Sequence, residues 1–453
     1  MRTEVGALAR LGAPLVLAQL AIVGMGAIDT ALAGRIDRAT LGGVAVGTAL
    51  WSVLLLLVIG TLIASATLIA EQKSAGHPER TRVIGQHALR LGGLIALVNF
   101  GLIQLAGWLL VAFGVAADVQ PAAIDFLRGI QWGLPALAVY AASRYYCEGM
   151  GHTRASMYVA LLGLALLYPI ARTLMFGADL GVVVIPPLKA YGCGLATAIT
   201  LTLEAIALQV YLRVQPELKR LQPWVWQPFE AAEVKRIAVL GLPVAFAILM
   251  EASLFYVVTL LMGTLGAKEV GAHQIAINVA ALAFMIPFGL AGALAIRVGQ
   301  ARGSGDPAQV RLAVRAGFAL TLATQCLSAT VMVLLATPIA RLYAPTDPEL
   351  VAGAALLMMY AAIFQLPDGL QVMANGALRG LQDTRIPALL TVVAYWLVGF
   401  PLTWWLGLKL GWGPGGLWIG FIGGLSMAAL LLGLRLRHTL ALQAPRRSLP
   451  ATA

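Results

Sequence analysis

The stretch LGAP at residues 11–14 returns, with one residue changed, as LGLP at residues 240–243. Three further short matches recur in the same order: Leu134-Pro135 with Leu366-Pro367, Thr153-Arg154 with Thr384-Arg385, and Pro169 with Pro401. The separations run from 229 (243 minus 14) to 232 residues (401 minus 169), about half of the chain. A half-length repeat in a hydrophobic chain is typical of a two-lobed membrane transporter, whose site lies where the lobes meet.

The composition places the chain in a membrane. Of 453 residues, 60% are hydrophobic and 11% are charged, about half the charged share of a soluble domain. A single soluble core of this length would not bury so much apolar sequence. The three cysteines, Cys147, Cys193 and Cys326, are far apart and indicate neither a disulfide framework nor a metal site. The first charged residues precede an apolar span without a small-residue cleavage site, so we expect no removable signal peptide.

Apolar runs predict twelve spans, each about long enough to cross a bilayer. Backbone polar groups in hydrocarbon must be satisfied within the segment, and the runs show no strand-like alternation, so we expect helices. The predicted spans are 9–33, 45–70, 88–114, 121–146, 155–177, 192–213, 236–262, 271–299, 313–342, 350–377, 386–408 and 414–435. A polar stretch separates six spans from six. We therefore predict an N-terminal lobe at 1–213, a cytoplasmic linker at 214–235, and a C-terminal lobe at 236–453 that ends in a short basic tail.

Basic residues predict the orientation of this all-α polytopic fold. An even number of spans puts both termini on one side, and 23 of the 31 Lys and Arg residues lie nearer to that side. The eight on the other side are Arg35, Arg38, Arg128, Arg172, Lys189, Lys268, Arg341 and Lys409. Because basic loops stay in the cytoplasm, both termini are predicted to be cytoplasmic. Six spans in each half give the halves the same orientation, so a pseudo-two-fold axis along the membrane normal would relate them. The net charge of +11 then reflects topology and anionic lipid rather than nucleic acid.

Four carboxylates fall well inside the predicted spans: Asp29, Glu204, Glu251 and Asp368. A charged side chain at mid-membrane costs roughly 2.5–3.5 kcal/mol on insertion scales, so an unpaired carboxylate at that depth indicates a function. In low dielectric a carboxylate favours its neutral form, and a proton or a cation can satisfy it. Competition between such a cation and a substrate would convert an ion gradient into export.

Glu251 and Asp368 are the main candidates for this role. The positions that match them in the first half hold Ile22 (251 minus 229) and Ala136 (368 minus 232), so the repeated fold requires a carboxylate at neither. The residues that share a polar helix face with Asp368 are Gln371 and Asn375. A structural ion pair for Glu251 and a polar helix–helix seam for Asp368 are the alternatives.

Asp29 and Glu204 have stronger structural alternatives. Arg172 in the fifth span reaches a depth similar to that of Asp29, and Asp29 is structural if the two form a pair. Glu204 would have no direct role if helix tilt turns it to the lipid headgroups or if it hydrogen-bonds to a neighbouring helix. The four histidines expected to be solvated, in loops or at span ends, are His77, His87, His152 and His438.

Several stretches resemble the multidrug and toxic compound extrusion (MATE) family, particularly its NorM-like branch. They are residues 11–51, which begin LGAPLVLAQL, residues 241–299, which begin GLPVAFAILMEASLF, residues 365–385, QLPDGLQVMANGALRGLQDTR, and residues 192–198, GCGLATA. The resemblance covers nearly the whole chain. It implies a V-shaped antiporter of twelve helices with a central cavity, which exports cationic or amphipathic drugs against inward Na⁺ or H⁺ flow.

The resemblance also implies roles for single residues. Glu251 and Asp368 resemble that branch's cation-site carboxylates, and they would ligate a monovalent cation if the coupling ion is Na⁺. Phe255 resembles their aromatic neighbour with a cation–π contact, and Asp29 resembles the protonatable aspartate of the first lobe. The family shares Gln274 and Asn278, and Asn278 would supply an oxygen near Glu251.

Three residues depart from the family pattern, and they weaken part of this transfer. Leu167 and Ala171 stand where many relatives carry asparagines, which weakens a cation or proton network around Asp29. Phe364 stands where a tyrosine is common and removes one oxygen ligand from the second lobe. The carboxylates of the second lobe survive these changes, so we place coupling there.

We therefore predict a secondary active multidrug antiporter of the bacterial inner membrane, with organic cations, amphipathic drugs and membrane lipid as its partners. We expect a monomer without a cofactor, and the residues leave Na⁺ and H⁺ open as coupling ions. No Walker loop or nucleophile–base constellation is present, which argues against an ATP-driven pump and against an enzyme. The alternatives are a lipid-linked oligosaccharide flippase of the same wider superfamily, and a passive channel or receptor.

Overall fold

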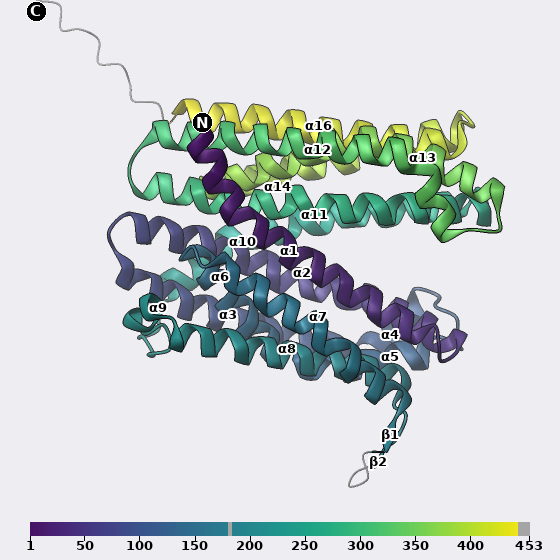
Figure 1. Ribbon diagram of the computed structural model, residues 1–453, viewed down its shortest axis with the longest axis horizontal. Helices are drawn as coiled ribbons and strands as arrows, with labels where there is room; N and C mark the ends of the chain where they lie inside the picture. The colour runs from purple at the N-terminus through teal and green to yellow at the C-terminus, as the bar shows by residue number, and fades with distance from the viewer. Residues whose placement is uncertain (180–183, 443–453) are drawn as a thin grey trace, which may run out of the picture. The chain divides into compact units, whose positions relative to one another are not determined.

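The computed structural model describes residues 1–179 and 184–442, and nearly all of them are helical (Figure 1). The helices are α1 Arg2–Ala33, α2 Arg38–Ser74, α3 Pro78–Gln104, α4 Ala106–Ala112, α5 Gln120–Ile130, η1 Gln131–Gly133, α6 Leu134–Gly149, α7 Thr153–Phe176, α8 Lys189–Val214, α9 Pro216–Leu221, α10 Ala231–Gly263, α11 Ala267–Gly303, α12 Pro307–Tyr343, α13 Pro348–Gly380, α14 Arg385–Val392, η2 Val393–Gly399, α15 Phe400–Trp404, η3 Trp405–Lys409 and α16 Gly413–Leu442. Two short strands, β1 Ala178–Asp179 and β2 Val184–Ile185, pair antiparallel between α7 and α8.

Each predicted span corresponds to helix in the structure, although span 88–114 is divided at Leu105 between α3 and α4. Eleven helical segments within the described ranges are long and apolar enough to cross a membrane, and one of them is the continuous run Arg385–Lys409. The remaining predicted span, 121–146, corresponds to α5, η1 and α6, a run that a 3₁₀ turn interrupts at Gln131–Gly133. Pro135 follows this turn and has no backbone N–H to donate, which favours a break in the hydrogen-bond pattern at this place.

The chain forms two compact units. The first unit contains residues 13–249, and the second contains residues 1–12 and 250–453. These limits differ from the predicted lobes, because the linker and the first half of α10 belong to the first unit and the first turns of α1 belong to the second. In the second unit, the Glu4 carboxylate accepts two hydrogen bonds from the Arg297 guanidinium, at 2.8 and 2.9 Å. The predicted repeat boundaries at 213 and 236 stay a prediction.

The repeated glycines of LGAP and LGLP lie at close helix contacts. A Cβ atom on Gly241 would lie 1.9 Å from the backbone oxygen of Thr61 in α2, and one on Gly12 would lie 2.7 Å from Leu290 Cδ2 in α11. Small residues let helix backbones approach in a membrane, where packing rather than the hydrophobic effect drives association. The repeat in the sequence therefore marks equivalent packing positions in α1 and α10.

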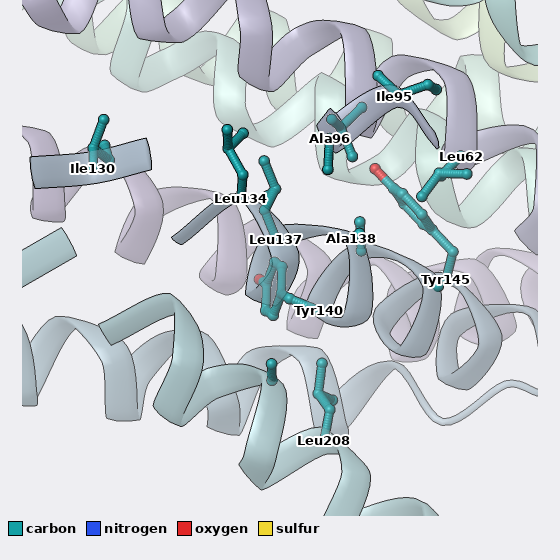
Figure 2. Packing of buried hydrophobic residues seen from close by; sticks show 14 of the residues in the cluster. Leu62, Ile95, Ala96, Ile130, Leu134, Leu137, Ala138, Tyr140, Tyr145 and Leu208 are labelled. Carbon is teal, nitrogen blue, oxygen red and sulfur yellow. The ribbon is translucent and has the colours of Figure 1, made fainter. Parts of the chain in front are cut away.

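The core of the first unit lies around α6. Leu137 and Leu134 are about 99% or more buried, and they pack with residues of α2, α3, α5 and α8 (Figure 2). Tyr140 of α6 and Leu208 of α8 belong to the same core (Figure 2). Because α6 is covered by helices rather than by lipid, a polar side chain on its surface must find its partners inside the protein.

The segment Gln222–Glu230, here called the strap, lies along the first half of α3. Gln86 donates to the Pro223 and Val225 oxygens and accepts from the Gln227 N–H at 2.6 Å. His87 is fully buried, and its Nε2 accepts a hydrogen bond from the Glu230 N–H at 2.8 Å. Arg90 donates to two strap oxygens and lies 5.0 Å from the ring centre of Trp226. The prediction that His87 is solvated is therefore wrong, because a backbone segment far along the chain covers it.

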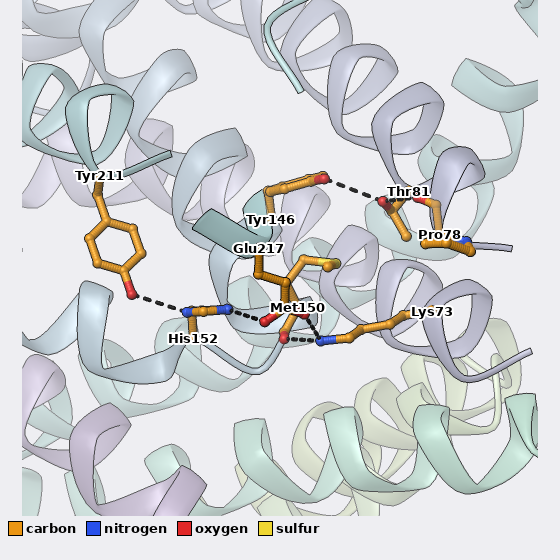
Figure 3. A network of polar contacts seen from close by, with 8 residues as sticks. All are labelled: Lys73, Pro78, Thr81, Tyr146, Met150, His152, Tyr211 and Glu217. Carbon is orange, nitrogen blue, oxygen red and sulfur yellow. Dashed lines mark hydrogen bonds and ion pairs between the residues drawn. The ribbon is translucent and has the colours of Figure 1, made fainter. Parts of the chain in front are cut away.

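A second polar network joins α2, α9 and the loop between α6 and α7 (Figure 3). Lys73 Nζ donates to Glu217 Oε1 at 2.6 Å and to the Met150 oxygen at 2.8 Å. His152 lies 3.0 Å from both Glu217 Oε2 and the Tyr211 hydroxyl, so it too is largely covered rather than solvated. Burial raises the pKa of Glu217, but the hydrogen bonds from Lys73 and His152 outweigh it and hold that pKa below its usual value.

Replacing Glu217 by glutamine should lower thermal stability at neutral pH. Since the pKa of Glu217 is lowered by folding, its stabilisation is present at pH 7 and disappears as the pH falls through that pKa. A half-exposed ion pair contributes about 0.2–1 kcal/mol, so we expect a decrease in Tm of about 1–3 °C. Thermal unfolding of the purified protein and of Glu217→Gln at pH 7 and pH 4 measures this difference. An equal decrease at both pH values would contradict it.

Candidate functional site

Glu251 of α10 joins a hydrogen-bonded cluster in the second unit. Gln371 of α13 donates through Nε2 to Glu251 Oε1 at 3.0 Å and to the Tyr395 hydroxyl at 2.7 Å. Asn375, one turn further along α13, donates to Gln371 Oε1 at 3.1 Å. Gln371 and Tyr395 are fully buried, whereas Glu251 and Asn375 are partly exposed. The structure thus brings together Glu251, Gln371 and Asn375, which were predicted from the sequence.

Asp368 lies one turn before Gln371 on α13 and is 99% buried. It is near enough to Glu251 for the two charges to interact. Its Oδ1 has no hydrogen-bond partner among the described residues. The adjacent Gly369 lets α12 approach, since a Cβ there would lie 2.7 Å from Gln325 Cγ, and Gln325 donates to the Gln365 oxygen at 2.9 Å. Gln325 and Gln365 thus form a polar contact between α12 and α13 beside Asp368.

Tyr395 is the site residue that the sequence analysis missed. It lies in η2, a π-helical turn, and its hydroxyl accepts the Gln371 hydrogen bond. Turns of this kind are rare and are frequent at functional sites, and no sequence pattern located this one. A usable signal was present, because tyrosines in membrane proteins gather at the interfaces, whereas Tyr395 lies well inside its apolar span.

Phe255 belongs to an aromatic cluster beside these polar residues. Its ring lies 4.6 Å from that of Phe421 and 5.9 Å from that of Phe364, both in edge-to-face geometry. Phe364 and Phe421 are almost fully buried, and Trp418 of α16 completes the cluster. Phe364, which replaces the tyrosine common in the family, thus fills an apolar position. Phe255 follows Glu251 by one turn on α10, and Phe364 precedes Asp368 by one turn on α13, so the cluster provides an apolar surface next to both residues in sequence.

Gln274 and Asn278 are exposed on α11. Their recorded hydrogen bond joins them to each other, from Gln274 Nε2 to Asn278 Oδ1 at 3.1 Å. The oxygen that Asn278 was expected to offer to Glu251 is therefore engaged elsewhere in this structure.

Asp29 belongs to the first unit, whereas the Glu251 cluster belongs to the second. It is about nine-tenths buried, accepts from the Thr197 hydroxyl at 3.3 Å, and contacts the Cys193 thiol. Arg172 is exposed, and no ion pair joins it to Asp29 within residues 1–179 and 184–442. The ion pair with Arg172, which was the structural alternative for Asp29, is therefore not found among the described residues.

The chemistry of the Glu251 cluster is that of oxygen ligands in an apolar surrounding. Two carboxyls, a phenol and two amides contribute the polar atoms. Hard cations prefer such oxygens, and two nearby carboxylates removed from water need protons or cations to neutralise them. Apolar helical spans that carry buried carboxyls of this kind are typical of a multi-pass membrane transport protein.

Comparison with known proteins identifies the family. The MatE family model matches residues 14–172 and 243–405, two segments whose starts differ by 229 (243 minus 14), the offset of the sequence repeat. The chain belongs to the MatE family. Its fold and its relatives make it a membrane transporter rather than an enzyme.

Relatives and solved structures agree over nearly the whole length. The "Probable multidrug resistance protein NorM" of Xanthomonas campestris is 41% identical over 96% of this chain and 94% of its own. The "Multidrug resistance protein PmpM" of Pseudomonas aeruginosa is 37% identical over 97% and 92%. A crystal structure of a eukaryotic MATE transporter matches with a TM-score of 0.86 at 20% identity, covering 97% of this chain and 98% of its own. An outward-facing multidrug resistance MATE family transporter matches with a TM-score of 0.89 at 16% identity, over 98% and 97%.

Proposed function

We propose that this chain exports cationic and amphipathic drugs across the bacterial inner membrane in exchange for inward Na⁺ or H⁺. The observation that carries the proposal is the pair Glu251 and Asp368, which lie near each other within apolar helices of the second unit. Asp368 is buried, and Glu251 accepts a hydrogen bond from the neutral amide of Gln371. Relatives named as multidrug resistance proteins favour drug export over transfer of a lipid-linked oligosaccharide.

In the proposed mechanism the two carboxyls bind either the coupling ion or the exported cation. With protons or Na⁺ bound, the site is neutralised and has little affinity for a cationic drug. Once the ion leaves to the cytoplasm, the negative charge attracts the drug from the same side. The Gln371 amide keeps Glu251 oriented during this exchange, and the Tyr395 hydroxyl keeps that amide in place. Mutual exclusion of ion and drug is what couples the two fluxes.

The placement of the protein in its membrane is part of the proposal. We propose a monomer with both termini in the cytoplasm, on the basis of the charge bias of the loops. Arg144, which was counted on the terminal side, is instead buried within α6, and Arg446 and Arg447 of the basic tail lie outside the described residues. The remaining bias still favours the terminal side.

Ethidium transport tests the proposed function and identifies the ion. Cells that express the protein should accumulate less ethidium than cells with an empty vector. Proteoliposomes with a Na⁺ gradient at clamped pH, and others with a pH gradient without Na⁺, separate the two coupling ions. Export under neither gradient, with the protein folded and inserted, would refute the proposal.

A further inference from the structure

A second buried ionisable cluster, which does not include Asp29, lies in the first unit. Tyr140, Arg144 and Glu148 follow each other at four-residue spacing on one face of α6, and Glu204 lies on α8. All four are at least 95% buried. Arg144 Nε donates to Glu148 Oε1 at 2.7 Å, and Arg144 Nη1 donates to the Tyr140 hydroxyl at 3.5 Å. Glu204 is near enough to Arg144 for their charges to interact.

Glu204 itself has neither of the roles considered from the sequence. It does not face lipid headgroups, because only 2% of it is exposed. It does not bind a neighbouring helix through Oε1, since that atom has no hydrogen-bond partner among the described residues. The side chain lies against α7 instead, where a Cβ on Gly163 would be 2.1 Å from Glu204 Oε1. Glycine at this position makes the room that the carboxyl occupies.

The charges of this cluster do not balance unless a proton is added. Arg144 supplies one positive charge, and its short hydrogen bond to Glu148 pairs it with that carboxylate. Glu204 is then a second carboxyl without a cation of its own, and an uncompensated charge buried in an apolar interior is strongly unfavourable. A metal ion would need several oxygens around it, whereas the surface opposite Oε1 is the Cα of a glycine. A proton, which needs no further room, neutralises Glu204 here.

We propose that Glu204 is a proton-binding site of the first unit. Glu204 holds one proton as long as the surrounding helices keep water away from the cluster, because the charges then balance. Access of water to α8 would remove the cost of the charged form, the O–H bond would then break, and the proton would pass to water. Because α7 closes over Glu204 at Gly163, a movement of α7 relative to α8 would control this exchange. The binding of a proton by Glu204 does not depend on the proposed ion-coupled function. Only the use of that proton in transport rests on it.

Infrared spectroscopy of the purified protein tests the proton directly. We expect the wild type to show a protonated-carboxyl band near neutral pH that Glu204→Gln lacks. Glu148→Gln should weaken the same band, because Arg144 is then left to balance the charge of Glu204. Glutamine has the size of the neutral acid, so Glu204→Gln should fold, which thermal unfolding checks. A wild-type minus Glu204→Gln difference spectrum without this band would overturn the proposal.

Two further measurements separate this proposal from the proposed function. An upward pH jump with a pH-indicator dye should release one proton fewer per molecule from Glu204→Gln than from the wild type, whether or not the protein transports drugs. If export is H⁺-coupled, its rate in Glu204→Gln should depend less on pH than in the wild type, while Glu251 and Asp368 keep the rest of that dependence. Equal proton release from both proteins would contradict the site, whereas normal release with no drug export would contradict the proposed function alone. Gly163→Ala should displace the carboxyl and lower Tm, and an unchanged Tm would contradict the contact at Gly163.

Discussion

Replacing Glu251 by glutamine should abolish drug export while leaving the fold intact. Glutamine keeps the size of the side chain and can still accept the Gln371 hydrogen bond, but it carries no charge and binds no proton. The site must bind the ion and the drug in turn, and without the Glu251 carboxylate it loses the negative charge for which they compete. We expect ethidium efflux to fall at least about tenfold, equivalent to about 1.4 kcal/mol in the transport barrier. Asp368→Asn should have an effect of the same size.

Efflux from cells and drug binding to the purified protein measure this effect together. The matched control is Glu349→Gln, which removes the charge of a largely exposed glutamate that pairs with Lys268 in the same unit. That variant should export at nearly the wild-type rate. Normal efflux in both Glu251→Gln and Asp368→Asn would show that coupling resides elsewhere. Tyr395→Phe should give a smaller loss, because Gln371 would retain its bond to Glu251.

Replacing Gly241 by valine should prevent the protein from folding. The Cβ atom alone would lie 1.9 Å from the Thr61 oxygen, which is a backbone atom and cannot turn aside. The neighbouring contact is also too close for a side chain, since a Cβ on Gly60 would lie 2.6 Å from the Ala245 Cα. Overpacking typically destabilises by about 1–3 kcal/mol, and separating two helix backbones should exceed this range. We expect little or no monodisperse protein after extraction from the membrane.

Size-exclusion profiles of detergent-solubilised protein check this expectation. Gly93→Ala is the matched control, because Gly93 is exposed on α3 and nothing lies within 4 Å of an added Cβ. It should leave the profile unchanged or raise Tm slightly, since alanine favours helix over glycine. A wild-type profile for Gly241→Val would mean that α2 and α10 do not approach as described.

The helices were predictable because the bilayer imposes their length and their apolar composition. The same reasoning identified Glu251 and Asp368, since a carboxylate at membrane depth is costly enough to require a reason. The family match confirmed the repeat offset first seen in LGAP and LGLP. The break at Gln131–Gly133 and the true ends of the helices depend on local hydrogen bonds, which composition does not report.

Contacts between distant segments were not predictable in the same way. Tyr395 reaches Gln371 from a π-helical turn, and His87 is covered by a strap that begins 135 residues later (222 minus 87). The position of Glu204 depends on a glycine on another helix. Each of these pairings joins residues of different elements, and a single sequence carries no signal that links them. The apolar runs predicted which segments are helices, whereas side-chain packing determined which residues of different helices contact each other.

The strap bears on how the protein is made. It closes over Gln86, His87 and Arg90 with backbone atoms that emerge from the ribosome long after α3 has entered the membrane. The first unit extends to residue 249, so the nascent chain contains all of that unit before α11 is synthesised. We therefore expect a truncated chain that stops after residue 249 to resist proteolysis in the membrane, and one that stops after residue 213 to be degraded, because it leaves those three side chains without their later-born partners.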